Sequence, residues 1–311
     1  MRVSRRIVNA IEAMLVSIEP GSCIAKAEGQ EYAHDRLQRA LTKKLGWLSK
    51  LSLYLLTLVT GKEGGYLVFD DTILERTGPG KLNLPKLRNS QGHYCFGLGV
   101  VLLIWSNGSI RIPLNLRLYF GDKSKQDLAL ELLVWAKEKD FKPDYVLFDS
   151  WYSSTKVLSK IHAYDWSFVT RLKKNRKLAG CQLKRHRGPY WTKIGNCRGL
   201  DFELKIVRRG KKFFASNDLH LVDKQIIATY KQRQAIEEVF RGLKQNLGWQ
   251  SFKYRTKQTL EAHLCLGLVA YSIIEIARTK LKLSFYKYHR MLIAKRTKPP
   301  IYLLEGISGS A

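Results

Sequence analysis

Three acidic positions in this sequence have the setting of metal ligands. Asp70 and Asp149 each follow a short apolar run typical of a buried strand, and Glu237 and Glu238 are adjacent in the stretch YKQRQAIEEVFRGLK, which starts at Tyr230. Functional side chains of open α/β sheets gather at the carboxyl ends of strands, so we expect Asp70 and Asp149 to lie close together. Two ionised carboxylates at short range repel each other, and a hard divalent cation such as Mg²⁺ relieves that repulsion. Taken singly, each aspartate is more simply the cap of a turn or of a following helix.

The helix predicted for this stretch distinguishes the two glutamates. At about 100° per residue, Tyr230, Arg233, Glu237 and Lys244 form one stripe about 60° wide. The stripe borders the face that we expect to be buried, which contains Ile236, Val239, Phe240, Leu243 and Leu247. Glu238 lies about 100° away and is expected to face solvent. The helical phase therefore selects Glu237, although an ordinary surface ion pair between Arg233 and Glu237 explains the same spacing.

The elements that must position these acids alternate in a way that predicts a mixed sheet. The expected strands are residues 66–69, 96–105, 109–120, 144–149 and 166–172, and the expected helices are 125–139, 153–164, 230–244 and 258–280. The second and third strands are joined by the short loop SNG and predict a hairpin. A hairpin followed by strand–helix units predicts an α/β fold, with a mixed sheet flanked by helices.

Other segments flank or interrupt this α/β region. Residues 1–62 carry apolar side chains at helical spacing and predict a helical N-terminal segment. Residues 63–280 would form the main domain, and 281–311 a basic C-terminal tail. The main domain is interrupted at 171–221 by an expected basic, β-rich insertion, since 171–212 alone hold 15 Lys or Arg and two acids.

Composition indicates a globular chain with a polyanionic partner. The chain has 311 residues, of which 45% are hydrophobic, and its 54 Lys and Arg against 26 acids give a net charge of +28. Such an excess favours nucleic acid as a partner, the alternative being a basic protein kept soluble by its charge. The longest apolar runs fall short of the ~18 residues of a membrane span, so no span is expected. Five cysteines without a CxxC pair indicate reduced thiols in the cytoplasm, and Cys181, His186 and Cys197 are only a weak zinc signal.

The chemically distinctive residues resemble those of the DDE transposases of insertion sequences. The stretch YKQRQAIEEVFRGLK fits the signature Y-x2-R-x3-E-x6-K at all four positions, FDDT resembles the first-aspartate motif D-x-T, and VLFDSWYSS resembles the second-aspartate motif. The resemblance runs from about Tyr66 to Lys280. It implies a ribonuclease H-like catalytic core with a β-rich insertion before the third acid. Carried over, the catalytic and metal-binding triad is Asp70, Asp149 and Glu237, with Asp71 as the alternative first acid.

The resemblance also implies an activity and a set of partners. The enzyme would use two Mg²⁺ ions, which Mn²⁺ can replace, to cleave double-stranded DNA at the ends of its mobile element and to transfer the strands to a target. It would act as a homodimer in a synaptic complex, without a membrane, in a prokaryotic cytoplasm. Two alternatives stay open: a catalytically inactive DNA-binding descendant, and a ribonuclease H-like nuclease without strand transfer.

The remaining implied site residues would contact DNA. Tyr230, Arg233 and Lys244 are expected beside the metals, where they hold phosphates. Trp191 and Lys212 are expected to grip DNA from the insertion. The aromatic residues of the insertion could stack on an unpaired base, and packing within the insertion explains them at least as well: Tyr190, Trp191, Phe213 and Phe214.

Overall fold

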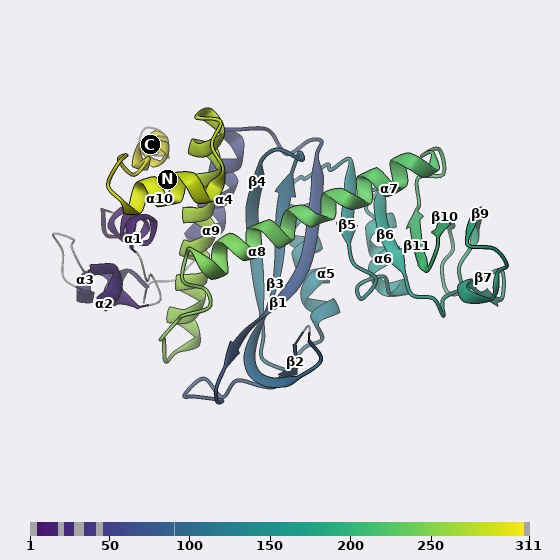
Figure 1. Ribbon diagram of the computed structural model, residues 1–311, viewed down its shortest axis with the longest axis horizontal. Coiled ribbons are helices and arrows are strands. Elements are labelled where there is room, and N and C mark those ends of the chain that lie inside the picture. The colour runs from purple at the N-terminus through teal and green to yellow at the C-terminus, as the bar shows by residue number, and fades with distance from the viewer. Residues whose placement is uncertain (1–4, 18–21, 28–33, 42–45, 90, 308–311) are drawn as a thin grey trace.

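A computed structural model describes residues 5–17, 22–27, 34–41, 46–89 and 91–307. Its centre is a nine-stranded mixed sheet in the order β2-β3-β1-β5-β6-β11-β10-β9, with β4 paired to β3 (Figure 1). The strands are β1 (Tyr66–Arg76), β2 (Lys86–Arg88), β3 (Tyr94–Ser106), β4 (Arg111–Tyr119), β5 (Tyr145–Phe148), β6 (Phe168–Leu172), β9 (Tyr190–Asn196), β10 (Glu203–Arg209) and β11 (Lys212–Ser216). A separate ribbon pairs β7 (Lys177–Leu178) with β8 (Cys181–Gln182).

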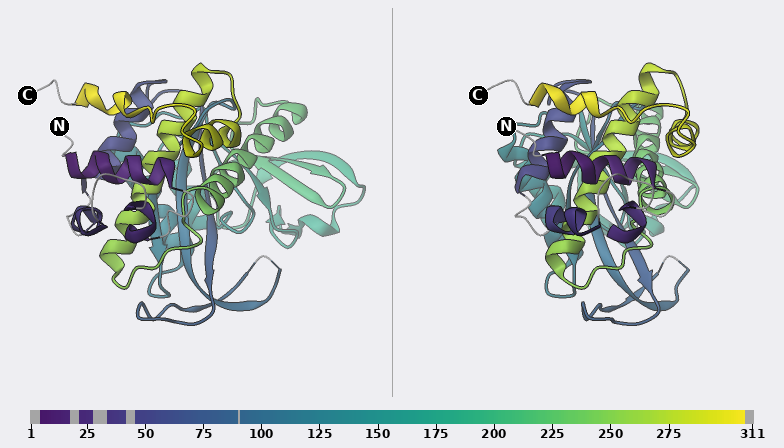
Figure 2. Two further views of the ribbon diagram at one scale, coloured as in Figure 1. Left: turned by 60° about the vertical axis from the view of Figure 1, so that its left-hand side comes forward. Right: turned by 90° about the vertical axis from the view of Figure 1, so that its left-hand side faces the viewer.

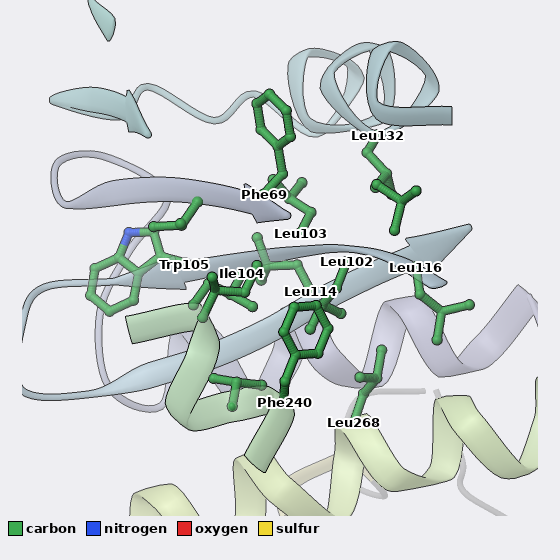
Figure 3. Close-up of a cluster of buried hydrophobic side chains, with 14 of the residues drawn as sticks. Phe69, Leu102, Leu103, Ile104, Trp105, Leu114, Leu116, Leu132, Phe240 and Leu268 are labelled. Atoms are coloured by element: carbon green, nitrogen blue, oxygen red, sulfur yellow. The ribbon is translucent and has the colours of Figure 1, made fainter. Parts of the chain in front are cut away.

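Helices cover both faces of this sheet. They are α1 (Arg5–Val16), α2 (Cys23–Ala27), α3 (His34–Leu41), α4 (Gly46–Thr57), α5 (Lys125–Glu138), α6 (Thr155–His162), α7 (Asp223–Lys231), α8 (Ala235–Gln245), α9 (Lys257–Lys280) and α10 (Phe285–Ile293), with short 3₁₀ turns η1 (Leu183–Arg185), η2 (Gln232–Gln234) and η3 (Ile301–Ile307). Figure 3 shows Leu132 of α5 on the Phe69 side of the sheet, and Phe240 of α8 and Leu268 of α9 on the other side. The α/β fold with a mixed sheet flanked by helices is therefore confirmed.

Strand β1 runs further than the sequence indicates. We expected it to end at Asp70, but it continues to Arg76. The reason is its long antiparallel partner β3, which pairs with β1 from Tyr66 to Arg76 and keeps the chain extended. On the other side, β5 runs parallel to β1, and this pairing stops at Val68 and Leu147. Asp70 is thus in the middle of a strand, two residues beyond the end of the parallel pairing.

The stretch that starts at Tyr230 is not one uniform α-helix. Helices α7 and α8 are joined by the 3₁₀ turn η2, which contains Arg233, and together they cross the front of the sheet (Figure 1). The face expected to be buried is buried throughout, at Ile236, Val239, Phe240, Leu243 and Leu247. A short 3₁₀ turn changes the helical phase only slightly, so the amphipathic pattern survives it.

The basic insertion continues the central sheet. Strand β11 pairs antiparallel with β6, from Phe213 opposite Leu172 to Ser216 opposite Val169, and β10 and β9 extend the sheet beyond it. Figure 1 shows these strands at one end of the molecule, away from α1 and α10. The insertion therefore lies beside β6 and α7 as part of the same sheet.

The two ends of the chain form a helical layer over α9. Helices α1 and α10 contact each other, and both contact α9 (Figure 2). The segment 281–311, expected as a tail, thus contributes a packed helix. Within the described residues, α9 is the one helix long and apolar enough to cross a membrane, with a mean hydropathy of 1.6, but 89% of that stretch is buried inside the protein. Its apolar character, which we underestimated from the sequence, belongs to a core helix.

Helix α2 is attached to α9 through a buried lysine. The Lys26 side chain is 2% exposed, its Nζ donates to the Tyr254 hydroxyl at 2.9 Å, and it lies 2.9 Å from Nδ1 of His263. Burial lowers the pKa of Lys26 to about 7 and lowers the pKa of His263 well below its usual value. At pH 7 Lys26 is therefore only about half protonated in the folded protein, and the His263 ring is neutral.

We expect stability to rise with pH because of Lys26. In the unfolded chain its pKa is ~10.4, so between pH 7 and about 10 the unfolded state binds more protons than the folded state. The free energy of unfolding should then increase by up to ~1.4 kcal/mol per pH unit in this window. Denaturant titrations at pH 7 and pH 9 test this on the wild type and on Lys26→Met, with the exposed Lys50→Met as the control. An equal pH response in wild type and Lys26→Met would contradict it.

Candidate active site

Asp70 lies on β1, and Asp149 directly follows β5, the parallel neighbour of β1. The register places Val68 opposite Leu147. One position further, the rings of Phe69 and Phe148 stack with their centroids 4.9 Å apart. The following residue is Asp70 on β1 and Asp149 just beyond the last residue of β5. Both carboxylates contact the segment of α7 and η2, so they lie on the same side of the sheet. The expected juxtaposition of these two residues is present.

The structure separates Asp70 from its neighbour Asp71. Successive side chains point to opposite faces of a strand, so Asp71 lies on the α5 side. There its carboxylate accepts hydrogen bonds from Nζ of Lys125 at 2.5 Å and from the hydroxyl of Tyr152 at 2.7 Å. Through these two hydrogen bonds Asp71 connects β1 to Lys125 of α5 and to Tyr152. Asp70, on the opposite face, is the acid that faces α8.

Arg233 connects the acids to one another. Its Nη1 donates to Oδ2 of Asp70 and its Nη2 donates to Oε1 of Glu237, both at 2.6 Å. Three residues earlier, the hydroxyl of Tyr230 lies 3.4 Å from Oδ1 of Asp149. Side chains of α7 and η2 therefore contact both aspartates, and Arg233 also contacts Glu237 at the start of α8.

The electrostatics of Asp70 reflect its crowded setting. Burial raises the pKa of the Asp70 carboxyl to about 7, although the Arg233 cation acts in the opposite direction. The negative charges of Asp71 and Asp149 add to the increase. Burial and the neighbouring carboxylates thus outweigh the ion pair with Arg233, and a divalent cation would favour the ionised form of Asp70.

Glu237 and Glu238 differ in their surroundings, though not as their helical phase indicates. The Glu237 side chain is 48% exposed and the Glu238 side chain 34% exposed, so Glu238 does not face solvent more than Glu237 does. Glu238 forms an ion pair with Arg241 at 2.9 Å, and both interact with Tyr286 of α10. The sequence reading is wrong on this point because it did not anticipate a packed helix on that side of α8.

Lys244 holds α8 against the central sheet. Its Nζ donates to the backbone oxygen of Ile73 on β1 at 3.0 Å, and burial lowers its pKa. On the other side of the helix, a Cβ at Gly242 would lie 2.7 Å from the ring of Tyr271 on α9, so only glycine permits this close approach. Lys244 is on the predicted stripe and was expected to hold a DNA phosphate. In the structure it instead contacts β1, the strand that carries Asp70. Contact with a phosphate would require it to leave Ile73.

The acids do not form a closed cluster of metal ligands. Across the part of the chain that the structure describes, no group of three or more His, Cys, Asp or Glu side chains is placed to hold a metal ion. The physical reason at this site is Arg233, whose guanidinium neutralises both Asp70 and Glu237. The donors themselves are carboxylate oxygens, which are the ligands that Mg²⁺ prefers. They fit a divalent cation that takes over the charge now supplied by Arg233.

A basic pocket of about 600 Å³ adjoins the acids on the α8 side. It is lined by Tyr230, Arg233 and Glu237, and by Lys212 of the insertion. Residues that sequence reasoning missed also line it: Arg171, Arg209, Lys211 and Lys231. Arg171 directly follows Thr170, the β6 partner of Phe148, and its position at this end of the strand next to β5 was the signal that could have identified it.

The aromatic residues of the insertion are mainly packed. Trp191 contacts Phe213, with ring centroids 5.9 Å apart, and His186, with centroids 5.4 Å apart. Phe213 and Phe214 are buried, and Trp191 is not among the residues that line the pocket. Tyr190, 70% exposed, is the member of this group that remains open to a ligand.

Two comparisons with known proteins find similarity. The sequence matches the family model of the transposase DDE domain over residues 62–273, whereas no curated protein matches the chain by sequence. Among solved structures, the fold is similar to that of a piggyBac transposase, determined in a synaptic complex with hairpin DNA, with a TM-score of 0.53 and 15% identity. This likeness covers 99% of the chain and 77% of the piggyBac chain, and at such low identity it concerns the fold alone.

The matched region includes the strands and the helix that bring the acids together. It starts before β1, contains β5, and ends within α9, beyond α8. With a family match over most of its length, the chain belongs to the DDE transposase family and is a DNA transposase, an enzyme of DNA cleavage and strand transfer.

Proposed function

We propose that this transposase cuts double-stranded DNA at the ends of its own mobile element and joins the released strands to a target. Asp70, Asp149 and Glu237 are the ligands of two Mg²⁺ ions, for which Mn²⁺ can substitute. The enzyme acts as a homodimer in a synaptic complex, in a prokaryotic cytoplasm. Members of the DDE transposase family generally depend on divalent metals, which agrees with this proposal.

The observation that carries the proposal is the arrangement of the acids around Arg233. Asp70 and Asp149 share one face at the end of the β1–β5 pairing, and Arg233 joins Asp70 to Glu237 by two hydrogen bonds of 2.6 Å. Bound Mg²⁺ would supply charge for the scissile phosphate and would activate water or a DNA 3′-hydroxyl.

The chain's own residues position the DNA. With cations at the acids, Arg233 is free to bind a DNA phosphate, which guanidinium groups hold in bidentate fashion. Tyr230 is placed to orient Asp149 or the same phosphate through its hydroxyl. Lys212 and Arg171 line the adjoining pocket of about 600 Å³, where they can neutralise the backbone of the bound strand. Lys244 keeps α8 at its distance from β1.

Metal-dependent nicking of the element's own ends tests the proposed function. The ends are found as terminal inverted repeats in the DNA flanking the gene, and a duplex that carries one repeat is incubated with the protein in Mg²⁺, in Mn²⁺ or in EDTA. We expect nicks at the end of the repeat and joined products with either metal, and neither in EDTA. Nicks without joined products would indicate a nuclease, and tight binding without nicks would indicate an inactive descendant.

We expect the affinity for duplex DNA to fall steeply with salt. The chain carries 28 more positive than negative charges, and each Lys or Arg that meets a phosphate releases a counterion. With about six phosphate contacts, affinity should drop roughly a thousand-fold between 50 and 200 mM salt. Fluorescence anisotropy with a labelled duplex at a series of salt concentrations measures the slope. A flat response would show that these charges do not meet the DNA backbone.

A further inference from the structure

A second pocket lies across the sheet edge from Arg233 and the adjoining basic pocket. Its volume is about 430 Å³. One of its lining residues is Ser150, which directly follows Asp149. Gln126 of α5 and Ser154, at the start of α6, belong to the same lining. The pocket is therefore on the α5 side of the sheet. We refer to it as the Trp151 pocket, after the aromatic residue in its wall.

The lining of the Trp151 pocket suits an anion. It contains four cationic side chains and no Asp or Glu: Lys173, Arg176, Lys177 and Arg198. Ser154 is the N-cap residue of α6 but makes no side-chain cap bond, and its buried Oγ has no hydrogen-bond partner among the described residues. Cationic side chains, an unpaired hydroxyl and the backbone N–H groups of a helix N-terminus together form a setting in which phosphate binds.

Trp151 is unusual for its exposure. Its side chain is 55% exposed, and among the tryptophans whose side chains the structure describes it alone is exposed. Nζ of Lys173 lies 4.8 Å from the centre of its ring. An exposed indole ring beside cationic groups offers a face on which a nucleic-acid base can stack.

The loop that carries Trp151 is held in place from several directions. The neighbouring Tyr152 is fully buried, and its hydroxyl is hydrogen-bonded inside the protein. Gln126 donates from Nε2 to the backbone oxygen of Trp151 at 3.1 Å, and Arg176 donates from Nη2 to the backbone oxygen of Ser153 at 2.5 Å. Trp151 is thus displayed by a fixed backbone, and a ligand meets a platform that is already ordered.

We propose that the Trp151 pocket binds an unpaired nucleotide of the DNA strand that passes Asp149. The base stacks on Trp151, and its phosphate is held by Lys173, Lys177 and Arg198. An aromatic platform beside basic groups is the general means by which proteins bind single-stranded DNA, and a pocket of this volume is large enough for one nucleotide. The inference rests on the proposed function, because it needs a DNA strand at Asp149.

Binding of matched DNA probes without metal tests this inference. The probes are a blunt duplex and the same duplex with a short single-stranded extension, measured in EDTA. We expect the wild type to prefer the extended probe, and Trp151→Ala to lose about 5- to 150-fold of its affinity for that probe, the range of one stacked base. Its affinity for the blunt duplex should change less than about two-fold. Trp151→Phe should keep most of the preference, because a phenyl ring still stacks.

Two further measurements separate stacking from charge and from other partners. Lys177→Ala and Arg198→Ala should each reduce the salt dependence for the extended probe by a little under one unit of slope, whereas Trp151→Ala should leave it unchanged. Tyr94→Ala, which removes a 69% exposed aromatic on β3, is the matched control and should behave as wild type.

Three results would overturn the inference. The first is that Trp151→Ala loses affinity equally for both probes, and the second is that it loses affinity for neither. The third is that sedimentation shows a change in self-association in place of a change in DNA binding. The last would make Trp151 part of a protein interface. Because no metal is present, these results do not depend on cleavage. A wild type that prefers the extended probe but does not nick DNA contradicts the proposed function alone. A wild type that nicks DNA but has no preference for the extended probe contradicts this inference alone.

Discussion

Asp149→Ala and Asp70→Ala are expected to lose metal-dependent nicking almost completely while they keep the fold and most of the affinity for DNA. Both acids sit on one face at the end of the β1–β5 pairing, where burial raises the pKa of Asp70 despite its ion pair with Arg233. Loss of a residue that only hydrogen-bonds to a metal ligand costs about 10- to 100-fold, so loss of a direct ligand should cost more than about 100-fold. Nicking of the cognate end in Mg²⁺ and binding of the same DNA in EDTA measure the two properties separately.

Asp71→Ala is the matched control for this prediction. Asp71 binds Lys125 and Tyr152 on the opposite face, so the substitution removes contacts of the fold and leaves the acids beside Arg233 intact. We expect a loss of about 1–3 kcal/mol in stability from the unpaired partners, with nicking retained well below the melting temperature. Normal nicking by Asp70→Ala together with an inactive, folded Asp71→Ala would exchange the roles of the two residues.

Glu237→Gln is expected to lose metal-dependent cleavage while the helix keeps its shape. The amide oxygen can still accept the hydrogen bond from Nη2 of Arg233, but a neutral amide is a poorer ligand for Mg²⁺ than a carboxylate. Nicking should fall by more than about 100-fold, on the same ground as for the aspartates. Binding of the cognate end in EDTA should remain close to that of the wild type.

Glu238→Gln provides the comparison at the adjacent position. Glu238 pairs with Arg241 beside Tyr286 and does not touch the aspartates or Arg233. We expect at most a small loss of stability, under ~1 kcal/mol for a partly exposed ion pair, and nearly normal nicking. An active Glu237→Gln beside an inactive Glu238→Gln would mean that the match to the Y-R-E-K spacing was assigned to the wrong glutamate.

Local patterns in the sequence were sufficient for the main strands and helices around the acids and for naming the acids themselves. The buried face of α8, from Ile236 to Leu247, follows from helical periodicity alone. The apolar run before Asp149 ends as expected, because β5 is short and its central residues are buried on both faces. The spacing of Tyr230, Arg233 and Glu237 on one stripe required only the geometry of a helix, and these residues do meet the edge of the sheet.

Tertiary structure decided what each of these residues touches. Strand β1 continues through Asp70, whose partner is Leu102, because the distant segment β3 supplies hydrogen bonds as far as Arg76. Glu238 is partly covered because α10 packs beside α8, and the insertion joins the sheet because β11 pairs with β6. Partners of this kind come from distant segments, and no local pattern encodes them.

The sequence by itself thus determined which side chains could act, since type and spacing are local properties. Only the tertiary structure decided that Arg233 bridges Asp70 and Glu237, and that Trp151 is displayed beside four cationic groups. The physical reason is that charge balance and burial depend on which groups come within a few ångströms in space. Those neighbours decide what the aspartates, Arg233 and Trp151 can bind.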